Sequence, residues 1–266
     1  MPSDLFSHCA SVVRRTEAAD MGCLEDAFAS NDLIVVPRPA KVLFPEYAML
    51  VSSFGTGTVI SIEAEFTDWV HTNRPKKHWA AFNASFLGQL AEHISKSTNP
   101  PGQLHARGIS LGFVLAEQPV IPGLPPGFKL EQRGRDWMDE WRLREQFHNS
   151  LGDPGEDDWY DRLANAFVIT DESGEPVAAT AVGDDGNGRM ELGLDVRRQW
   201  RGLGLARPAV LAASRWVLDQ GQVPYYTCGA ANVRSHLVAE SCGYRPLWSI
   251  SGIARIVEGV GDQAAH

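Results

Sequence analysis

The stretch Glu191-Leu-Gly-Leu-Asp-Val-Arg-Arg-Gln-Trp-Arg-Gly-Leu-Gly-Leu-Ala206 decides the fold. Residues 190–196 are predicted to form a strand and residues 205–220 a helix. Between them, Gly202 and Gly204 let the backbone turn sharply and approach a ligand closely. Free N–H groups at the helix start, together with the helix dipole, form an anion site suited to a pyrophosphate. Arg201 can add a charge-assisted contact to a phosphate.

A two-glycine turn alone is also compatible with an ordinary tight connection between a strand and a helix. No Gly-Lys-Ser/Thr follows it, so it is not a Walker loop. The glycine spacing and the hairpin-joined strands before it exclude a dinucleotide-binding fingerprint. The wider sequence context therefore has to decide between a phosphate site and a plain turn.

In that context the stretch resembles motif A of the GCN5-related N-acetyltransferases, the GNAT superfamily. Arg201, Gly204 and Ala206 occupy the places of its Arg/Gln-x-x-Gly-x-Gly/Ala signature, and Val196 stands where the fourth strand ends in that family. Further on, Asn232, Ser235, Gly243 and Tyr244 match its Asn-x-x-Ala/Ser and Gly-Phe/Tyr positions. The resemblance covers residues 124–258, about half of the chain.

The resemblance implies that the fourth and fifth strands part and that the pantetheine arm of acetyl-CoA, or another acyl-CoA, lies between them. Its amides then pair with backbone groups around Leu194 and Val196. Gly193 is consistent either with the bulge that the family has in this strand or with close packing. The implied cofactor-binding residues are Leu194, Val196, Arg201, Gly202, Leu203, Gly204, Leu205, Ala206, Asn232 and Ser235.

For catalysis, the resemblance implies direct transfer of the acyl group to an amine, which needs a base. Glu191 is our candidate base, and its alternative is a solvated carboxylate at a strand end. Without a bulge, strand alternation puts it on the same side as Asp195. The tyrosine that the family often uses as the acid is absent, because Ala239 stands at its position.

Other groups are candidates for the acid. Tyr225 and Tyr226 lie on the predicted fifth strand, and we select Tyr226 as the catalytic residue. Cys228 and His236 are further candidates, although a buried small thiol and a locally satisfied imidazole are their more ordinary interpretations.

The domain boundary is predicted at the connector Pro119-Val-Ile-Pro-Gly-Leu-Pro-Pro-Gly127. We expect an α/β (α+β) chain: a smaller N-terminal α/β domain at 1–122, then a GNAT-like domain at 123–266 with a mixed, mostly antiparallel sheet flanked by helices. The N-terminal half carries no motif with assigned chemistry. It is either a degenerate copy of the same fold or a lid that shapes the acceptor site.

The predicted elements follow from periodicity and turn signals. Before the connector, helices are expected at 5–30, 65–70 and 80–95, with strands at 33–36, 47–53, 58–62 and within 104–115. After it, strands are expected at 128–132, 167–170, 176–182, 190–196, 225–228 and 247–256, and helices at 137–147, 157–164, 205–220 and 233–241. Asp136 is the expected cap of the helix from Trp137.

Composition narrows the function classes. The chain of 266 residues has a net charge of −9, and neither predicted half is basic, so nucleic acid is not an expected partner. The four cysteines form no C-x-x-C pair and no metal site is expected. No apolar run is long enough for a membrane helix and the N-terminus has no signal-peptide pattern, so we expect a cytoplasmic protein away from membranes.

The leading hypothesis is therefore an acyl-CoA-dependent N-acyltransferase, typically an acetyltransferase, with a small-molecule or peptidic amine acceptor. A homodimer is compatible with the sequence. The alternative is a non-catalytic acyl-CoA-binding or regulatory module, and a third reading changes the donor to a longer or carrier-bound acyl group. Six aromatic and acidic residues suit a cationic amine acceptor, although they equally suit a core face and a solvated loop. They are Trp137, Trp141, Asp157, Asp158, Trp159 and Tyr160.

Overall fold

A computed structural model describes residues 4–40, 45–97, 104–152 and 157–255. The chain divides into two compact units, each described here by itself. Unit 1 comprises residues 1–13, 113–227 and 232–246, and unit 2 comprises residues 14–112, 228–231 and 247–266. The boundary predicted at residue 122 lies inside unit 1, and the division into two consecutive domains stays a prediction.

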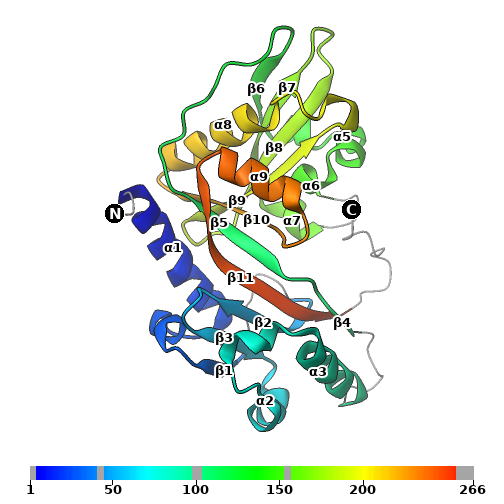
Figure 1. Ribbon diagram of the computed structural model, residues 1–266. Helices are drawn as coiled ribbons and strands as arrows, with labels where there is room; N and C mark the ends of the chain where they lie inside the picture. Colours follow the sequence, from blue (N-terminus) through cyan, green and yellow to red (C-terminus); the bar gives the residue numbers. More distant parts are fainter. Residues whose placement is uncertain (1–3, 41–44, 98–103, 153–156, 256–266) are drawn as a thin grey trace. The chain divides into compact units, whose positions relative to one another are not determined.

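Unit 1 is built on the strands β6 (Lys129–Arg133), β7 (Leu163–Thr170), β8 (Pro176–Asp184), β9 (Arg189–Val196) and β10 (Val223–Gly229), in the spatial order of their numbers (Figure 1). The pairs from β6 to β9 are antiparallel, whereas β9 and β10 are parallel. Hairpin turns at 171–175 and 185–188 join β7, β8 and β9, as the turn residues Asp, Ser and Gly predict. The expected mixed, mostly antiparallel sheet is confirmed.

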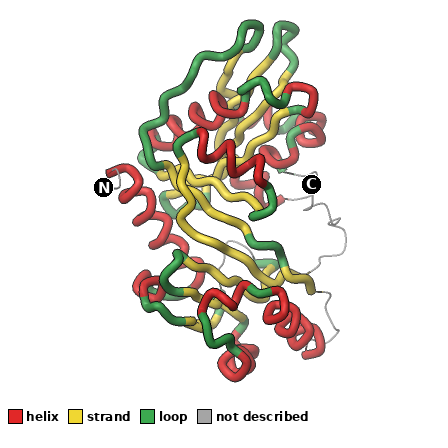
Figure 2. Tube along the Cα trace, viewed as in Figure 1, coloured by secondary structure: helices red, strands yellow, loops and turns green. Residues whose placement is uncertain are grey.

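Helices cover both faces of this sheet, because its strands alternate buried side chains between two cores. One core joins Ala179 and Ala181 to the short helices α4 (Arg135–Met138), α5 (Trp141–Gln146) and α6 (His148–Leu151). The other joins Ala178 and Ile169 to the start of α8 (Ala206–Asp219). Figure 2 distinguishes these helices from the strands by colour. Unit 1 also contains α7 (Asp157–Arg162), α9 (Val233–Ser241) and the first part of the long N-terminal helix α1 (Asp4–Met21).

Unit 2 has the strand order β1 (Leu33–Pro37), β3 (Thr58–Ile62), β2 (Tyr47–Ser53) and β11 (Tyr244–Arg255), with β4 (Leu104–Ala106) also paired to β11. Of these pairs, β1–β3 is parallel, whereas β2–β3, β2–β11 and β4–β11 are antiparallel. The strands pack on α2 (Thr67–Asn73) and α3 (Ala84–Ser97) through one core, and on the region of α1 (Asp4–Met21) through another. β5 (Ser110–Leu115) and β11 each contribute residues to both units.

The prediction of a single helix at 137–147 is wrong. The chain forms α4 and α5 instead, with Glu140 extended at the break and Gly134, not Asp136, before the first helix. Asp139 at this break accepts hydrogen bonds from Arg135 Nε at 3.1 Å and from the Tyr160 hydroxyl. A contact with a residue 21 positions away in sequence is a tertiary effect that helical periodicity does not contain.

The other expected helices and strands form with shifts at their ends. The helix expected at 5–30 ends at Met21 and is followed by the 3₁₀ turn η1 (Glu25–Ala29). The helix expected at 80–95 begins as the 3₁₀ turn η3 (His78–Phe82) and continues as α3. The one expected at 65–70 becomes η2 (Ala64–Phe66) and α2, and a third 3₁₀ turn in the loop after β9 is η4 (Arg198–Trp200). Among the described residues, no helix is both long and apolar enough to cross a membrane.

The bulge considered at Gly193 is also absent, because β8 and β9 keep one register from Ala178↔Val196 to Asp184↔Met190. Gly193 is required for packing: a Cβ there would lie 2.3 Å from Asn149 O and 3.0 Å from Ser150 Cα. Helix α6 therefore lies against bare backbone of β9, which fixes the distance between this helix and the strand.

Gly193→Ala should consequently destabilise unit 1 by about 1–3 kcal/mol, the usual cost of forcing an extra methyl into a closed contact. Urea unfolding followed by circular dichroism measures this change. Gly123→Ala is the matched control, because nothing lies within 4 Å of a Cβ at that position. Equal stability of the two variants would contradict the packing role of Gly193.

Candidate functional site

The strands β9 and β10 part within unit 1. They pair in parallel over Val223↔Arg189, Pro224↔Met190 and Tyr225↔Glu191 and no further in the described residues of the two strands. Beyond Glu191, β9 continues to Val196 while β8 alone pairs with it. This is the separation between the fourth and fifth strands that the family resemblance implied.

The backbone of β9 beyond Glu191 offers polar groups on the side where the strands part. The Arg197 N–H donates to Val177 O of β8 at 2.9 Å, so the odd-numbered residues of β9 turn their backbone groups toward β8. By alternation, the N–H and C=O groups of Leu192, Leu194 and Val196 point to the opposite edge. Val196 O there accepts the Arg201 Nε–H at 2.9 Å. The positions predicted to pair with pantetheine amides, Leu194 and Val196, thus lie on the parted edge.

The loop after β9 has the geometry expected of an anion site. Gly202 and Gly204 have φ angles of +83° and +78°, and a Cβ on either would meet no atom within 4 Å. Both glycines, Arg201 and Leu203 are exposed, whereas Leu205 is buried beneath them. Positive φ is accessible to glycine without strain, so the loop can present its backbone to a ligand.

Helix α8 begins directly after this loop at Ala206, and no side chain caps its first N–H groups. An uncapped helix start leaves backbone donors for an anion and adds the positive end of the helix dipole. Arg201 and Arg207 on either side of the start are exposed cations. The residues present therefore fit the pyrophosphate of an acyl-CoA, and they fit its amides along β9.

The other two predicted cofactor residues lie at the start of α9. The Asn232 side chain is the N-cap of this helix and accepts a hydrogen bond from the Ser235 N–H at 3.2 Å. Asn232 is exposed and Ser235 is half-buried. Their contact with a cofactor stays a prediction.

Glu191 lies where the strands begin to part, among polar groups of both strands. Its carboxylate accepts hydrogen bonds from the Thr227 hydroxyl and, at 3.2 Å, from the Tyr225 hydroxyl. Burial is the main cause that raises the pKa of Glu191 above its ordinary value, and the negative charge of Asp185 raises it further. The hydrogen bond from Thr227, the Arg162 guanidinium and the Tyr225 hydroxyl act in the opposite direction. A carboxyl group shifted toward neutrality in this way is suited to accept a proton.

Asp185 connects Glu191 to two arginines. Its fully buried carboxylate lies 2.5 Å from Arg162 Nη1 and 3.0 Å from Arg189 Nε. It also accepts the Tyr225 hydroxyl at 2.6 Å. Buried charges are tolerated when they are paired and hydrogen-bonded, as they are here.

Tyr225 has one hydroxyl proton and two carboxylate neighbours. Its pKa is raised well above the ordinary value, first by burial and then by the charges of Glu191 and Asp185. It therefore keeps its proton at working pH. The hydroxyl donates to Asp185 Oδ2 at 2.6 Å and to Glu191 Oε2 at 3.2 Å, so the two carboxylates share its one proton and the nearer one receives the shorter hydrogen bond.

The predicted pair of Glu191 and Tyr226 is not brought together. Tyr225 is the register partner of Glu191, so Tyr226 projects from the opposite face. There it is buried, with its ring 6.4 Å from that of Tyr244, whose hydroxyl lies 2.7 Å from Ser214 Oγ of α8. A catalytic role of Tyr226 stays a prediction.

The remaining candidate acids have structural surroundings. Burial raises the pKa of the Cys228 thiol to about 11, and the His236 ring lies against Phe113 with 5.5 Å between centroids. Sequence reasoning missed Asp185, Arg162, Arg189 and Thr227, because only the register of β9 and β10 and the turn before β9 bring them to Glu191. No spacing in the sequence encodes that register.

The aromatic residues predicted as possible acceptor contacts, where the structure describes their side chains, contact other groups of unit 1. The Arg135 and Arg144 guanidinium groups both lie over the Tyr160 ring, at 4.0 and 4.1 Å from its centroid. Trp159 Nε1 donates to Ser150 O at 3.0 Å, and both Trp159 and Trp137 pack on the core of α4 to α6. The side chains of Trp141, Asp157 and Asp158 lie outside the described residues.

Unit 1 thus combines a mostly antiparallel sheet whose strands β9 and β10 part, an uncapped helix start beside the parting, and the half-buried Glu191 at the fork. Residues 135–244 match the acetyltransferase (GNAT) family, and this segment is a GNAT acetyltransferase domain. The match confirms the resemblance stated from the sequence. No curated protein matches the chain.

Solved structures similar to this chain include three GNAT proteins. A GCN5-related N-acetyltransferase-like protein from Streptococcus suis is 19% identical, with a TM-score of 0.42 over 65% of this chain and 69% of that one. A GCN5-related N-acetyltransferase from Sphaerobacter thermophilus is 13% identical, with a TM-score of 0.44 over 76% and 73%. A tandem GNAT protein from the clavulanic acid biosynthesis pathway is 13% identical, with a TM-score of 0.46 over 96% and 97%.

Proposed function

We propose that the chain is an N-acyltransferase that moves an acetyl or other acyl group from acyl-CoA to an amine by direct attack. The observation that carries the proposal is the position of Glu191, a carboxyl group of raised pKa at the fork between β9 and β10. The acyl-CoA supplies the acyl group as an activated thioester. The amine nitrogen bonds to the acyl carbon, the amine proton passes to the Glu191 carboxylate, and the carbon–sulfur bond breaks so that CoA leaves as its thiolate.

The chain's own residues support each requirement of this reaction. The loop 201–206 and the start of α8 hold the phosphates, and the edge of β9 holds the amides of the donor. A backbone N–H on the parted edge of β9 stabilises the negative charge that develops on the thioester oxygen. Thr227 and Tyr225 donate hydrogen bonds to the two carboxylate oxygens of Glu191, and these bonds hold the base in one orientation.

Calorimetric titration with acetyl-CoA, combined with a thiol-release assay over a panel of small amines and peptides, tests the proposal. We expect binding and release of one CoA thiol per acylated amine. Tight binding without transfer to any amine would favour the alternative, a non-catalytic acyl-CoA-binding module. Transfer from longer acyl-CoA donors only would keep the reaction and change the donor.

Arg201→Gln should weaken CoA binding about five- to tenfold, because it removes a charge-assisted phosphate contact of about 1–1.5 kcal/mol. Calorimetry on the free enzyme measures this change. Arg133→Gln removes the same charge from an exposed pair with Glu131 on β6 and should leave the affinity unchanged. Equal affinities of the two variants would contradict a phosphate contact at Arg201.

The pH dependence of kcat/KM should show an acid limb due to Glu191. The active form is deprotonated, and burial with the charge of Asp185 raises its pKa. Activity is therefore lost as the pH falls through a value above about 4.3, the ordinary glutamate pKa. An electron-poor aromatic amine such as 4-nitroaniline, which stays uncharged in this range, separates this limb from ionisation of the acceptor. A midpoint at or below the ordinary value would contradict the environment described for Glu191.

A further inference from the structure

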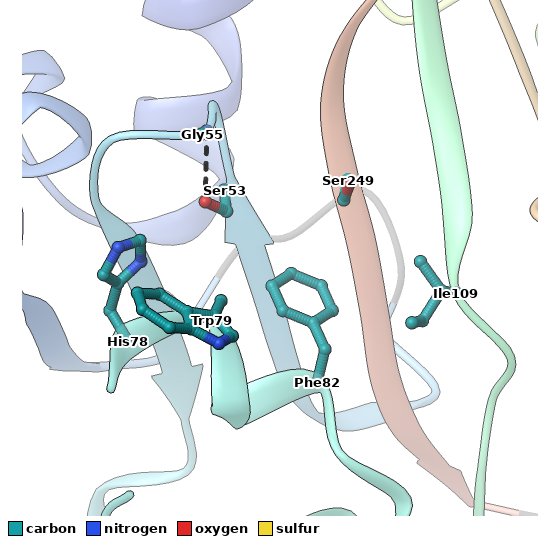
Figure 3. A pocket seen from close by; sticks show the side chains of 7 residues that line it. All are labelled: Ser53, Gly55, His78, Trp79, Phe82, Ile109 and Ser249. Carbon is teal, nitrogen blue, oxygen red and sulfur yellow. Dashed lines mark hydrogen bonds between the residues drawn. The ribbon is translucent and has the colours of Figure 1, made fainter. Parts of the chain in front are cut away.

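Unit 2 contains a cavity of about 250 Å³ that the proposed reaction does not use. It is lined by His78, Trp79 and Phe82 of η3, by Ile109 and Ser249, and by the turn from Ser53 to Gly55 (Figure 3). All of these residues belong to unit 2. The cavity is smaller than the 300–1,000 Å³ typical of drug-sized ligands, so it suits a ligand with one or two rings.

The wall of the cavity is aromatic and open to solvent. Trp79 is 57% exposed and Ile109 is 36% exposed, although both are large apolar residues. In Figure 3, Phe82 lies between Trp79 and Ile109. Covering such surface with a flat apolar ligand is favourable, because aromatic faces combine a large buried area with preferred stacking geometries.

This wall is held in place by polar contacts beneath it. His78 Nδ1 lies 2.9 Å from Thr58 Oγ1 of β3, which fixes the start of η3. The Ser53 hydroxyl donates to Gly57 O at 2.8 Å and accepts the Gly55 N–H at 3.2 Å, which fixes the opposite turn. A preformed cavity of this kind loses little conformational freedom when a ligand binds.

The charges at the cavity favour an anion. No carboxylate is among its lining residues. The segment Arg74-Pro-Lys-Lys-His78, which leads into η3, has three cations and no anion in a chain of net charge −9. The Lys77 ammonium lies 5.1 Å from the centre of the Trp79 ring. A cation therefore lies over a ring that lines the cavity, and it would attract an anionic ligand bound there.

From these observations we infer that the cavity of unit 2 is a binding site for a small planar aromatic anion, such as an aromatic carboxylate. The aromatic wall contacts the rings of the ligand, and Lys77 attracts its charge. This inference is independent of the acyl transfer proposed for unit 1.

Calorimetric titration of the full chain with 2-naphthoate, and with the uncharged 2-naphthamide, tests the inference. We expect naphthoate to bind at least about threefold more tightly than naphthamide, with no change when CoA is present. Trp79→Ala should weaken naphthoate about tenfold, from lost apolar contact. Lys77→Gln should weaken it about two- to fivefold. The control variants Leu24→Ala and Lys96→Gln remove an exposed apolar group and an exposed cation elsewhere in unit 2 and should have no effect.

The indole N–H resonance of Trp79, identified by its loss in Trp79→Phe, provides a second measurement on the unaltered chain. Naphthoate should shift this resonance more than those of the other seven tryptophans. Equal affinity for the acid and the amide, an unchanged affinity of Trp79→Ala, competition by CoA, or an unmoved Trp79 resonance would each overturn the inference.

Discussion

Glu191→Gln should reduce kcat for acyl transfer by about 10²–10⁴, the range expected when a general base is removed. Glutamine has the same shape and can still accept the hydrogen bond from Thr227, but it cannot take a proton from the amine. The affinity for CoA should therefore stay within about twofold of the original. Steady-state thiol release and calorimetry measure the two quantities.

Glu175→Gln is the matched control for this variant, because Glu175 lies exposed in the turn between β7 and β8. Its kcat should be unchanged. If Glu191→Gln kept kcat within about threefold, the carboxylate would be structural and the base would lie elsewhere. A loss of CoA affinity equal to the loss of rate would likewise remove the evidence for a catalytic role.

Asp185→Asn should destabilise the fold by about 3–5 kcal/mol, since it removes the anion from a buried network and leaves charge behind. The side chain of Arg189 is only 4% exposed and that of Arg162 only 17% exposed, so water compensates poorly for the lost carboxylate. Urea unfolding measured by circular dichroism gives the free energy of unfolding directly.

The neighbouring substitution Asp184→Asn is the control for this variant. Asp184 is half-buried and accepts one hydrogen bond, from the Gly186 N–H at 2.8 Å. This substitution should cost less than about 1 kcal/mol, because the amide oxygen of asparagine can still accept that hydrogen bond. Comparable stability of the two variants would mean that the arginines do not depend on Asp185.

The Asp185→Asn protein that remains folded allows a second measurement, the pH dependence of the reaction rate. The negative charge of Asp185 raises the pKa of Glu191, so its removal should shift the acid limb of the pH–rate profile to lower pH. An unchanged midpoint would show that the two carboxyl groups are not coupled.

Much of the architecture of unit 1 could be predicted from the sequence, because its signals are local. The alternation of β9, the glycines at 202 and 204 and the helix period of α8 each act within a few residues. Helix α9 was predicted with the bounds that it has, since Asn232 caps it and Gly243 ends it with φ of +80°. The anion loop depends on the same short-range features.

The environment of Glu191 could not be predicted, because it depends on contacts distant in sequence. Tyr225 reaches it across 34 positions and Thr227 across 36, through the register between β9 and β10. A shift of one residue in that register would have placed Tyr226 beside Glu191 instead. The break at Glu140 and the packing role of Gly193 have the same origin in tertiary contacts.

A crystal structure with CoA bound tests the central claim most directly, because it locates the donor relative to Glu191. The account predicts the pyrophosphate at the N–H groups of the loop 201–206 and the start of α8, with the pantetheine amides along Leu192, Leu194 and Val196. It also predicts that the thiol end lies at the fork beside Glu191. A CoA molecule bound away from this loop, or with its thiol far from Glu191, would contradict the account.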